Sequence, residues 1–185
     1  RIKDTYPGEP FTKRCVGLLN DILVREPASW QNQTEGICIG VIGCETGSGA
    51  STVAQAMTTV ATEKMRLETK LLMGASSSLR SQATTAEPSL DDRIAEIKPN
   101  VDLVILDLPA ATQVNHPAVF CEQLDYIILV VAAEEAHEGD VRRSIDRFAT
   151  FPAQLDGRPR FGGIVLNKCF QPIPKFIRRL AVGET

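Results

Sequence analysis

Five short apolar runs, separated by segments with helical periodicity, constrain the fold of this chain more than any other feature. The runs cover residues 36–42, 69–73, 102–108, 126–132 and 162–167. Their nearly unbroken hydrophobicity is typical of strands that are buried on both faces of a parallel sheet. The alternation of runs and helical segments predicts an α/β fold, in which a mostly parallel central sheet is flanked by helices in three layers.

Apolar residues recur every three or four positions in the segments outside these runs, which predicts amphipathic helices there. The patterns run from Phe11 to Ile22, Val53 to Ala61, Leu90 to Ile97, Val141 to Ala149 and Ile173 to Leu180. Residues 74–89 are rich in serine, threonine and alanine, and they predict a connecting loop.

Composition excludes several classes of function. The 185 residues are 43% hydrophobic and carry a formal net charge of -3, so the basic excess that nucleic-acid binding requires is absent and no nucleic-acid partner is expected. The five cysteines show no paired spacing, which favours a reduced, cytoplasmic setting. No apolar run reaches the roughly 20 residues of a membrane span. Since the chain begins with Arg1, we expect membrane contact only through segments outside this sequence, as in the cytoplasmic domain of an anchored protein.

A glycine-containing loop follows the first apolar run and precedes a helical pattern. The phosphate-binding motif G-x-x-x-x-G-K-[ST] occurs in this context. Here Cys44 stands at the first glycine, Gly49 at the second, Ala50 at the lysine and Ser51 at the hydroxyl. Backbone N–H groups build the phosphate cradle, so the loss of lysine removes charge without removing the cradle. The alternative is a turn that merely joins a strand to a helix.

If the loop binds nucleotide, its residues divide the contacts among the phosphates and the metal. The backbone of four residues is predicted to hold the β-phosphate, namely Gly47, Ser48, Gly49 and Ala50. Ser51 is predicted to hold Mg²⁺ and Thr52 the α-phosphate. Asp107 ends a later apolar run and is predicted to contact Mg²⁺ through water.

The order of these motifs resembles the bacterial tyrosine kinases of exopolysaccharide export, relatives of the partition and septum-site ATPases. The resemblance runs from Phe11 to Asn167 and rests on "GSGAST", "VILDLPA" and "GGIVLNKC". It implies a P-loop NTPase-like domain over residues 36–185, preceded by an N-terminal arm and helix over residues 1–35, within a single domain. It also implies ATP or ADP with Mg²⁺ as ligands and an adenine contact by Asn167.

The sequence departs from this family at the positions that carry catalysis. The kinases have two aspartates after the strand that follows the loop helix, where this chain has Gly74 and Ser76. In a second register the strand at 69–73 matches a later strand of the family and the acidic strand is deleted; the acids are missing in both. The C-terminal tyrosine cluster of the kinases is also absent, because the chain has only Tyr6 and Tyr126.

These losses favour a degenerate member without catalytic residues, a pseudokinase that acts as a binding, scaffolding or regulatory module, with weak or lost nucleotide binding. Expected partners are a membrane chain-length regulator or a second copy of the chain, in exopolysaccharide biosynthesis. One alternative is an active ATPase or tyrosine kinase whose missing groups come from a partner. Another is a structural platform that binds no nucleotide.

Overall fold

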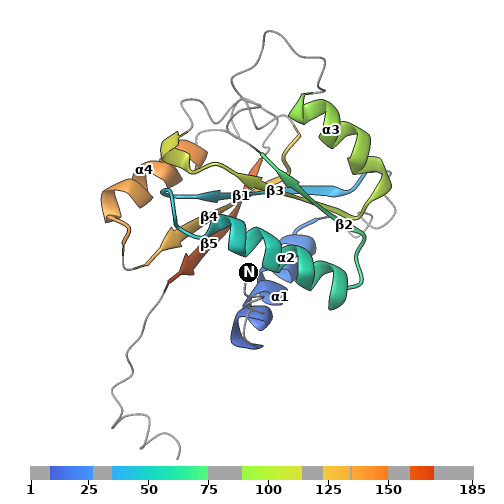
Figure 1. Cartoon of the computed structure of the whole chain (residues 1–185), viewed down its shortest axis with the longest axis horizontal. Coiled ribbons are helices and arrows are strands. Elements are labelled where there is room, and N and C mark those ends of the chain that lie inside the picture. Colours follow the sequence, from blue (N-terminus) through green and yellow to red (C-terminus); the bar gives the residue numbers. More distant parts are fainter. Residues whose placement is uncertain are drawn as a thin grey trace, which may run out of the picture.

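The computed structural model describes residues 9–26, 35–74, 89–113, 123–133, 135–149 and 159–168. Within them a five-stranded sheet has the order β2-β3-β1-β4-β5, and every pairing is parallel (Figure 1). The strands are β1 (Ile37–Gly43), β2 (Thr69–Met73), β3 (Leu103–Leu108), β4 (Tyr126–Ala132) and β5 (Arg160–Asn167). The α/β fold class predicted from the apolar runs is confirmed.

Helices cover both faces of the sheet and complete three layers (Figure 1). On one face, α1 (Glu9–Val24) and α2 (Ala50–Glu63) share an apolar core with the sheet. On the other face lie α3 (Leu90–Ile97) and α4 (Glu138–Ala149). Two short 3-10 helices, η2 (Lys98–Asn100) and η3 (Ala111–Gln113), flank β3. The predicted helix at 173–180 and most of the predicted loop at 74–89 lie outside the described residues.

Local sequence signals explain where these helices begin and which way they face. The N-cap of α3 is Ser89, which exchanges hydrogen bonds with Asp92 in a capping box. Helix α1 places Cys15, Leu19 and Ile22 toward the core at helical spacing, and all three are buried. The same core cluster contains Met57 of α2. The N-terminal helix therefore packs against the same sheet as the rest of the chain.

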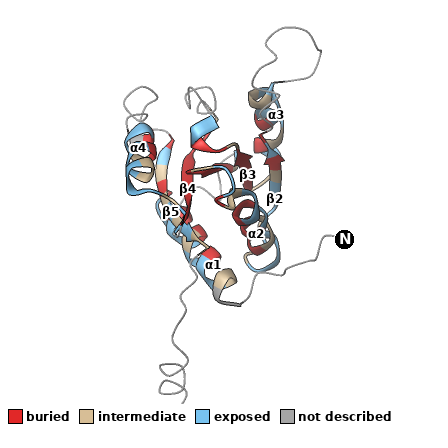
Figure 2. Cartoon of the chain, turned by 60° about the vertical axis from the view of Figure 1, so that its left-hand side comes forward, coloured by how far each residue is buried: buried red, intermediate tan, exposed pale blue. Residues whose placement is uncertain are grey.

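Burial distinguishes the central strands from the edge strands. All residues of β1, β3 and β4 are buried, as the unbroken apolar runs predict. The prediction is wrong for β2 and β5, which lie at the two edges and are only partly buried (Figure 2). An apolar run indicates a strand, but its neighbours determine how much of its surface is covered. Exposed apolar side chains follow from this at Met73, Ile164 and Leu166.

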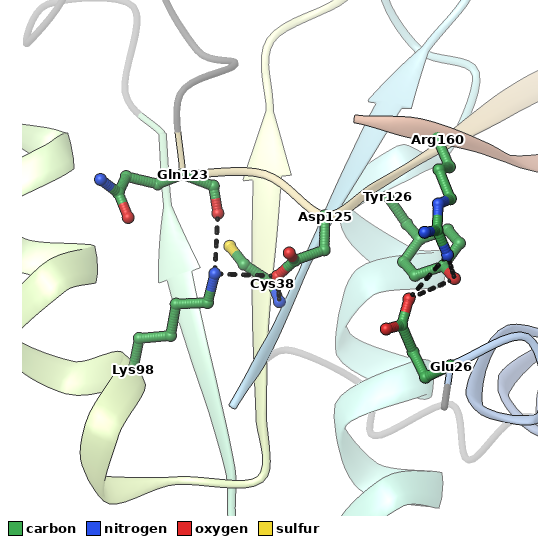
Figure 3. A network of polar contacts seen from close by, with 7 residues as sticks. All are labelled: Glu26, Cys38, Lys98, Gln123, Asp125, Tyr126 and Arg160. Atoms are coloured by element: carbon green, nitrogen blue, oxygen red, sulfur yellow. Dashed lines mark hydrogen bonds and ion pairs between the residues drawn. The ribbon is translucent and has the colours of Figure 1, made fainter. Parts of the chain in front are cut away.

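A buried ion pair joins η2 to the segment that enters β4. Lys98 Nζ lies 2.9 Å from Asp125 Oδ2, and the two side chains are 11% and 6% exposed (Figure 3). The same carboxylate accepts a hydrogen bond of 2.8 Å from the backbone N–H of Cys38. Lys98 Nζ also lies 3.5 Å from the carbonyl oxygen of Gln123. These contacts offset the cost of burying both charges and fix the amino ends of β1 and β4.

Tyr126 forms a second polar cluster at the same ends of the strands. Its hydroxyl donates to Glu26 Oε1 at 2.6 Å, and Arg160 Nη1 lies 3.2 Å from that oxygen (Figure 3). Burial, followed by the contact with Glu26, raises the pKa of the Tyr126 phenol. The cluster ties the end of α1 to β4 and β5.

Among the helices of the described residues, none combines the length and the apolar character that a membrane crossing requires.

Candidate nucleotide-binding site

The phosphate-loop segment forms a tight turn between β1 and α2 at the carboxyl end of the sheet. Gly47 and Gly49 have φ of 84° and 89°, in the left-handed region that favours glycine. Gly49 is the N-cap of α2 and provides no side-chain cap. The first turn of α2 therefore directs its N–H groups toward the loop without a capping side chain, which is the arrangement that binds anions at helix N-termini.

A hollow of about 280 Å³ lies over this turn. Five of the seven predicted nucleotide contacts line it, namely Gly47, Ser48, Gly49, Ala50 and Ser51. Thr52 is exposed on the first turn of α2 and is not among the lining residues. The other side of the hollow comes from the segment after β3, which includes Pro109 and Gln113. The structure thus brings the predicted phosphate residues to one small depression.

Sequence reasoning missed Gln113 as a member of this hollow. Gln113 belongs to η3, six positions after Asp107, and its side chain is exposed. Its position in the turn that leaves the strand of Asp107 is the signal that could have identified it. An amide at this place can donate to a phosphate oxygen or accept from a ligand.

Asn167 is the last residue of β5, and its side chain reaches the phosphate loop. Its Nδ2 donates to the carbonyl oxygen of Ser48 at 2.9 Å. A Cβ atom built on Gly49 would lie 2.1 Å from that same nitrogen. The amide therefore packs directly on the loop backbone and holds the loop against the end of β5. This pairing joins residues that are 119 positions apart in sequence.

Ser51 and Asp107, the two predicted magnesium ligands, are in contact. Asp107 pairs in register with Val41 of β1, and it is 7% exposed. Burial raises the pKa of the Asp107 carboxyl, and the hydrogen bond from Ser51 acts in the opposite direction. A hydroxyl and a carboxylate are both hard oxygen ligands that suit Mg²⁺. The donor set therefore fits the metal, with other positions left to water and phosphate.

Gly74 lies beside Asp107, at the end of the strand next to β3. Strand β2 pairs with β3, with Met73 opposite Asp107, and Gly74 follows directly. The N–H of Gly74 donates to the carbonyl oxygen of Asp107 at 2.8 Å, and a Cβ at position 74 would lie 3.1 Å from that oxygen. In either register of the family resemblance, the strand beside β3 therefore ends without a carboxylate. Ser76 lies outside the described residues.

The charges around the hollow do not favour phosphate. Among the described residues that line it, Glu45 is the charged one, and none is a lysine or an arginine. Lys168, which follows Asn167, makes an ion pair with Glu135 at 2.9 Å. No group of three or more His, Cys, Asp or Glu side chains within the described residues could hold a metal ion. Phosphate affinity at this site would depend on backbone N–H groups and on Mg²⁺.

Cys44 lies at the start of the loop but points into the core. Its side chain is fully buried, and its sulfur lies 3.6 Å from the hydroxyl of Ser144 on α4. Burial raises the pKa of the thiol, so the nucleophilic thiolate is disfavoured at neutral pH. Cys44 therefore helps to join β1 to α4.

Comparison with known proteins places this fold among bacterial tyrosine kinase domains. The chimerical protein CapA2B2 superposes with a TM-score of 0.66 at 16% identity, covering 89% of this chain and 87% of that protein. The kinase domain of Escherichia coli tyrosine kinase ETK superposes with a TM-score of 0.54 at 15% identity, covering 81% of this chain and 74% of that protein. The BceF tyrosine kinase domain superposes with a TM-score of 0.55 at 13% identity, covering 85% of this chain and 76% of that protein. The structural resemblance expected from the sequence motifs is confirmed at the level of the fold.

Sequence comparison adds no closer relative. No protein-family model matches the chain, and no curated protein matches it. The fold is therefore that of an α/β domain similar to bacterial tyrosine kinase domains.

Proposed function

We propose that this chain is a degenerate relative of the bacterial tyrosine kinases, a pseudokinase that binds ATP or ADP with Mg²⁺ weakly and acts as a scaffolding or regulatory module. One observation carries the proposal: the loop has a backbone turn with Gly47 and Gly49 in the left-handed region, while none of the described residues that line the hollow over it is cationic. Binding requires the turn and the N–H groups. Phosphoryl transfer also requires charge where the transition state develops it.

The place beside Asp107 supports the same conclusion. A nucleophile activated by a carboxylate would need an acid on the strand next to β3, and Gly74 occupies that position. Its N–H group donates to the backbone of Asp107 and holds the two strand ends together. In one register of the family resemblance, an aspartate would stand at this position. The proposed partner is a protein, either a membrane chain-length regulator or a second copy of the chain, in exopolysaccharide biosynthesis.

The test is calorimetric titration of the full chain with ATP and ADP, with and without Mg²⁺, and a phosphate-release assay on the same sample. Ala50→Lys restores the missing charge. A hydrogen bond to a charged group contributes about 1.5–3 kcal/mol, so we expect the affinity for ATP to rise by roughly tenfold to a hundredfold. The matched control is Ala95→Lys, at an exposed position of α3 on the other face of the sheet.

The outcomes separate the alternatives. Binding without phosphate release, strengthened by Ala50→Lys but not by Ala95→Lys, supports the proposal. Phosphate release by the wild-type chain, alone or at concentrations where it self-associates, would establish an active enzyme instead. If neither the wild-type chain nor the Ala50→Lys variant binds millimolar ATP, the loop is a structural turn and the proposal is wrong.

A further inference from the structure

The hollow over the phosphate loop suits the phosphates of a ligand better than a whole nucleotide. Its volume of about 280 Å³ lies just below the range of about 300–1,000 Å³ in which proteins enclose small ligands. Residues 45–51 form one wall, and their backbone N–H groups and the first turn of α2 suit an oxyanion. Ser51 and Asp107 add oxygen ligands that suit Mg²⁺. Phosphate and metal are common to all nucleotides, so these groups do not distinguish one base from another.

The opposite wall of the hollow offers little that selects a base. It consists of Leu108, Pro109, Ala110 and Gln113. Proteins hold nucleic-acid bases by stacking them on aromatic side chains and by hydrogen bonds to their edges. None of the described residues that line the hollow is aromatic, and on this wall Gln113 is the one that carries hydrogen-bonding groups in its side chain. The described lining therefore has phosphate contacts without a surface on which a base stacks.

Asn167, the residue expected to contact adenine, reaches the loop from the other side. The strand order places β3 and β5 on opposite sides of β1. The second wall of the hollow follows β3, whereas Asn167 ends β5 and is not among the lining residues. Its Nδ2 donates to the carbonyl oxygen of Ser48 at 2.9 Å and leaves no room for a Cβ atom at Gly49. To turn toward a base, the amide would have to leave the loop backbone.

The contact with Ser48 fixes the direction of one peptide group of the loop. In a planar trans peptide the C=O and the following N–H point in opposite directions. Because the carbonyl oxygen of Ser48 faces Asn167, the N–H of Gly49 points away from β5, and Gly49 lines the hollow. Asn167 thus orients a backbone donor that a phosphate oxygen can use.

We propose that this site binds the diphosphate group of a Mg²⁺-bound ligand without selecting its base, and that Asn167 is a positioning residue that orients the N–H of Gly49. The inference rests on the proposed function and defines its ligand class. ADP, UDP and inorganic pyrophosphate with Mg²⁺ all belong to this class.

Calorimetric titration of the full chain with these three ligands in the presence of Mg²⁺ tests the inference. We expect their dissociation constants to agree within about threefold. Asn167→Ala should weaken the binding of all three by about fivefold, the ratio that corresponds to one hydrogen bond between neutral groups. Asn167→Asp keeps the shape but replaces the donor with an acceptor, and it should weaken binding at least as much. Ile164→Ala is the matched control, because Ile164 is a partly exposed residue of the same strand, and binding should be unchanged. Circular dichroism at the titration temperature confirms that each variant is folded.

Two results would overturn the inference and leave the proposed function intact. One is binding of ADP more than about tenfold tighter than that of UDP and pyrophosphate, which would establish a subsite for the base. The other is an Asn167→Ala variant that loses affinity for ADP and keeps its affinity for pyrophosphate, because the amide would then contact the base. If none of the three ligands binds at millimolar concentration, the proposed function is wrong and the inference is wrong with it.

Discussion

The contact between Gly49 and Asn167 predicts that two glycines of one loop differ in their tolerance of alanine. Both have positive φ, so alanine is strained at either position, by roughly 1–2 kcal/mol. A Cβ on Gly47 meets nothing within 4 Å, whereas a Cβ on Gly49 would lie 2.1 Å from Asn167 Nδ2. The Gly49 variant must therefore also displace the amide and lose its hydrogen bond to Ser48, at a further cost of about 1 kcal/mol.

We therefore expect Gly47→Ala to lower the free energy of unfolding by about 1–2 kcal/mol and Gly49→Ala by about 2–3 kcal/mol. In a chain of this size each kcal/mol corresponds to a decrease in Tm of roughly 2–4 °C. Urea unfolding followed by circular dichroism measures the first quantity, and calorimetry measures the second.

A double-mutant cycle isolates the contact itself. In an Asn167→Ala background the amide is gone, so Gly49→Ala should cost about as much as Gly47→Ala does in the wild-type chain. The coupling energy between positions 49 and 167 is then about 1 kcal/mol. If Gly49→Ala costs the same in both backgrounds, the Asn167 amide does not hold the loop against β5.

The remaining predictions concern two buried carboxylates. Because burial raises the folded-state pKa of Asp107, its stabilising contribution is present below the unfolded pKa of about 3.9 and is lost as pH rises through the folded value. The Asp107→Asn variant should therefore be more stable than the wild-type chain at pH 7 and lose that advantage near pH 3. Urea titrations at the two pH values measure this. If the variant and the wild-type chain have the same free energy of unfolding at both pH values, the prediction is wrong. Asp125→Ala leaves Lys98 buried without its carboxylate and should lower the free energy of unfolding by about 3–5 kcal/mol. Arg142→Ala, in an exposed pair, should change it by no more than about 0.5 kcal/mol, and similar losses in both variants would refute this account of the buried pair.

Several parts of the candidate site could be predicted from local sequence. The turn requires glycines at positions 47 and 49, a helix must follow it, and Asp107 ends an apolar run, so each of these features is encoded within a few residues. The loss of the lysine at Ala50 is likewise visible without a structure. What could not be predicted is which distant groups meet at the loop, because the contact of Asn167 with Ser48 depends on β4 lying between β1 and β5.

The sequence by itself determined the elements of this protein and their order, since apolar runs and helical periodicity are local properties of the chain. Tertiary structure alone decided which strands became edges. The sequence predicts β2 and β5 as buried strands, yet each has a neighbouring strand on one side only, and so Ile164 and Leu166 are exposed. The ion pair between Lys98 and Asp125 was likewise decided by the tertiary structure. Strand order creates such contacts, and strand order results from packing both faces of the sheet at once.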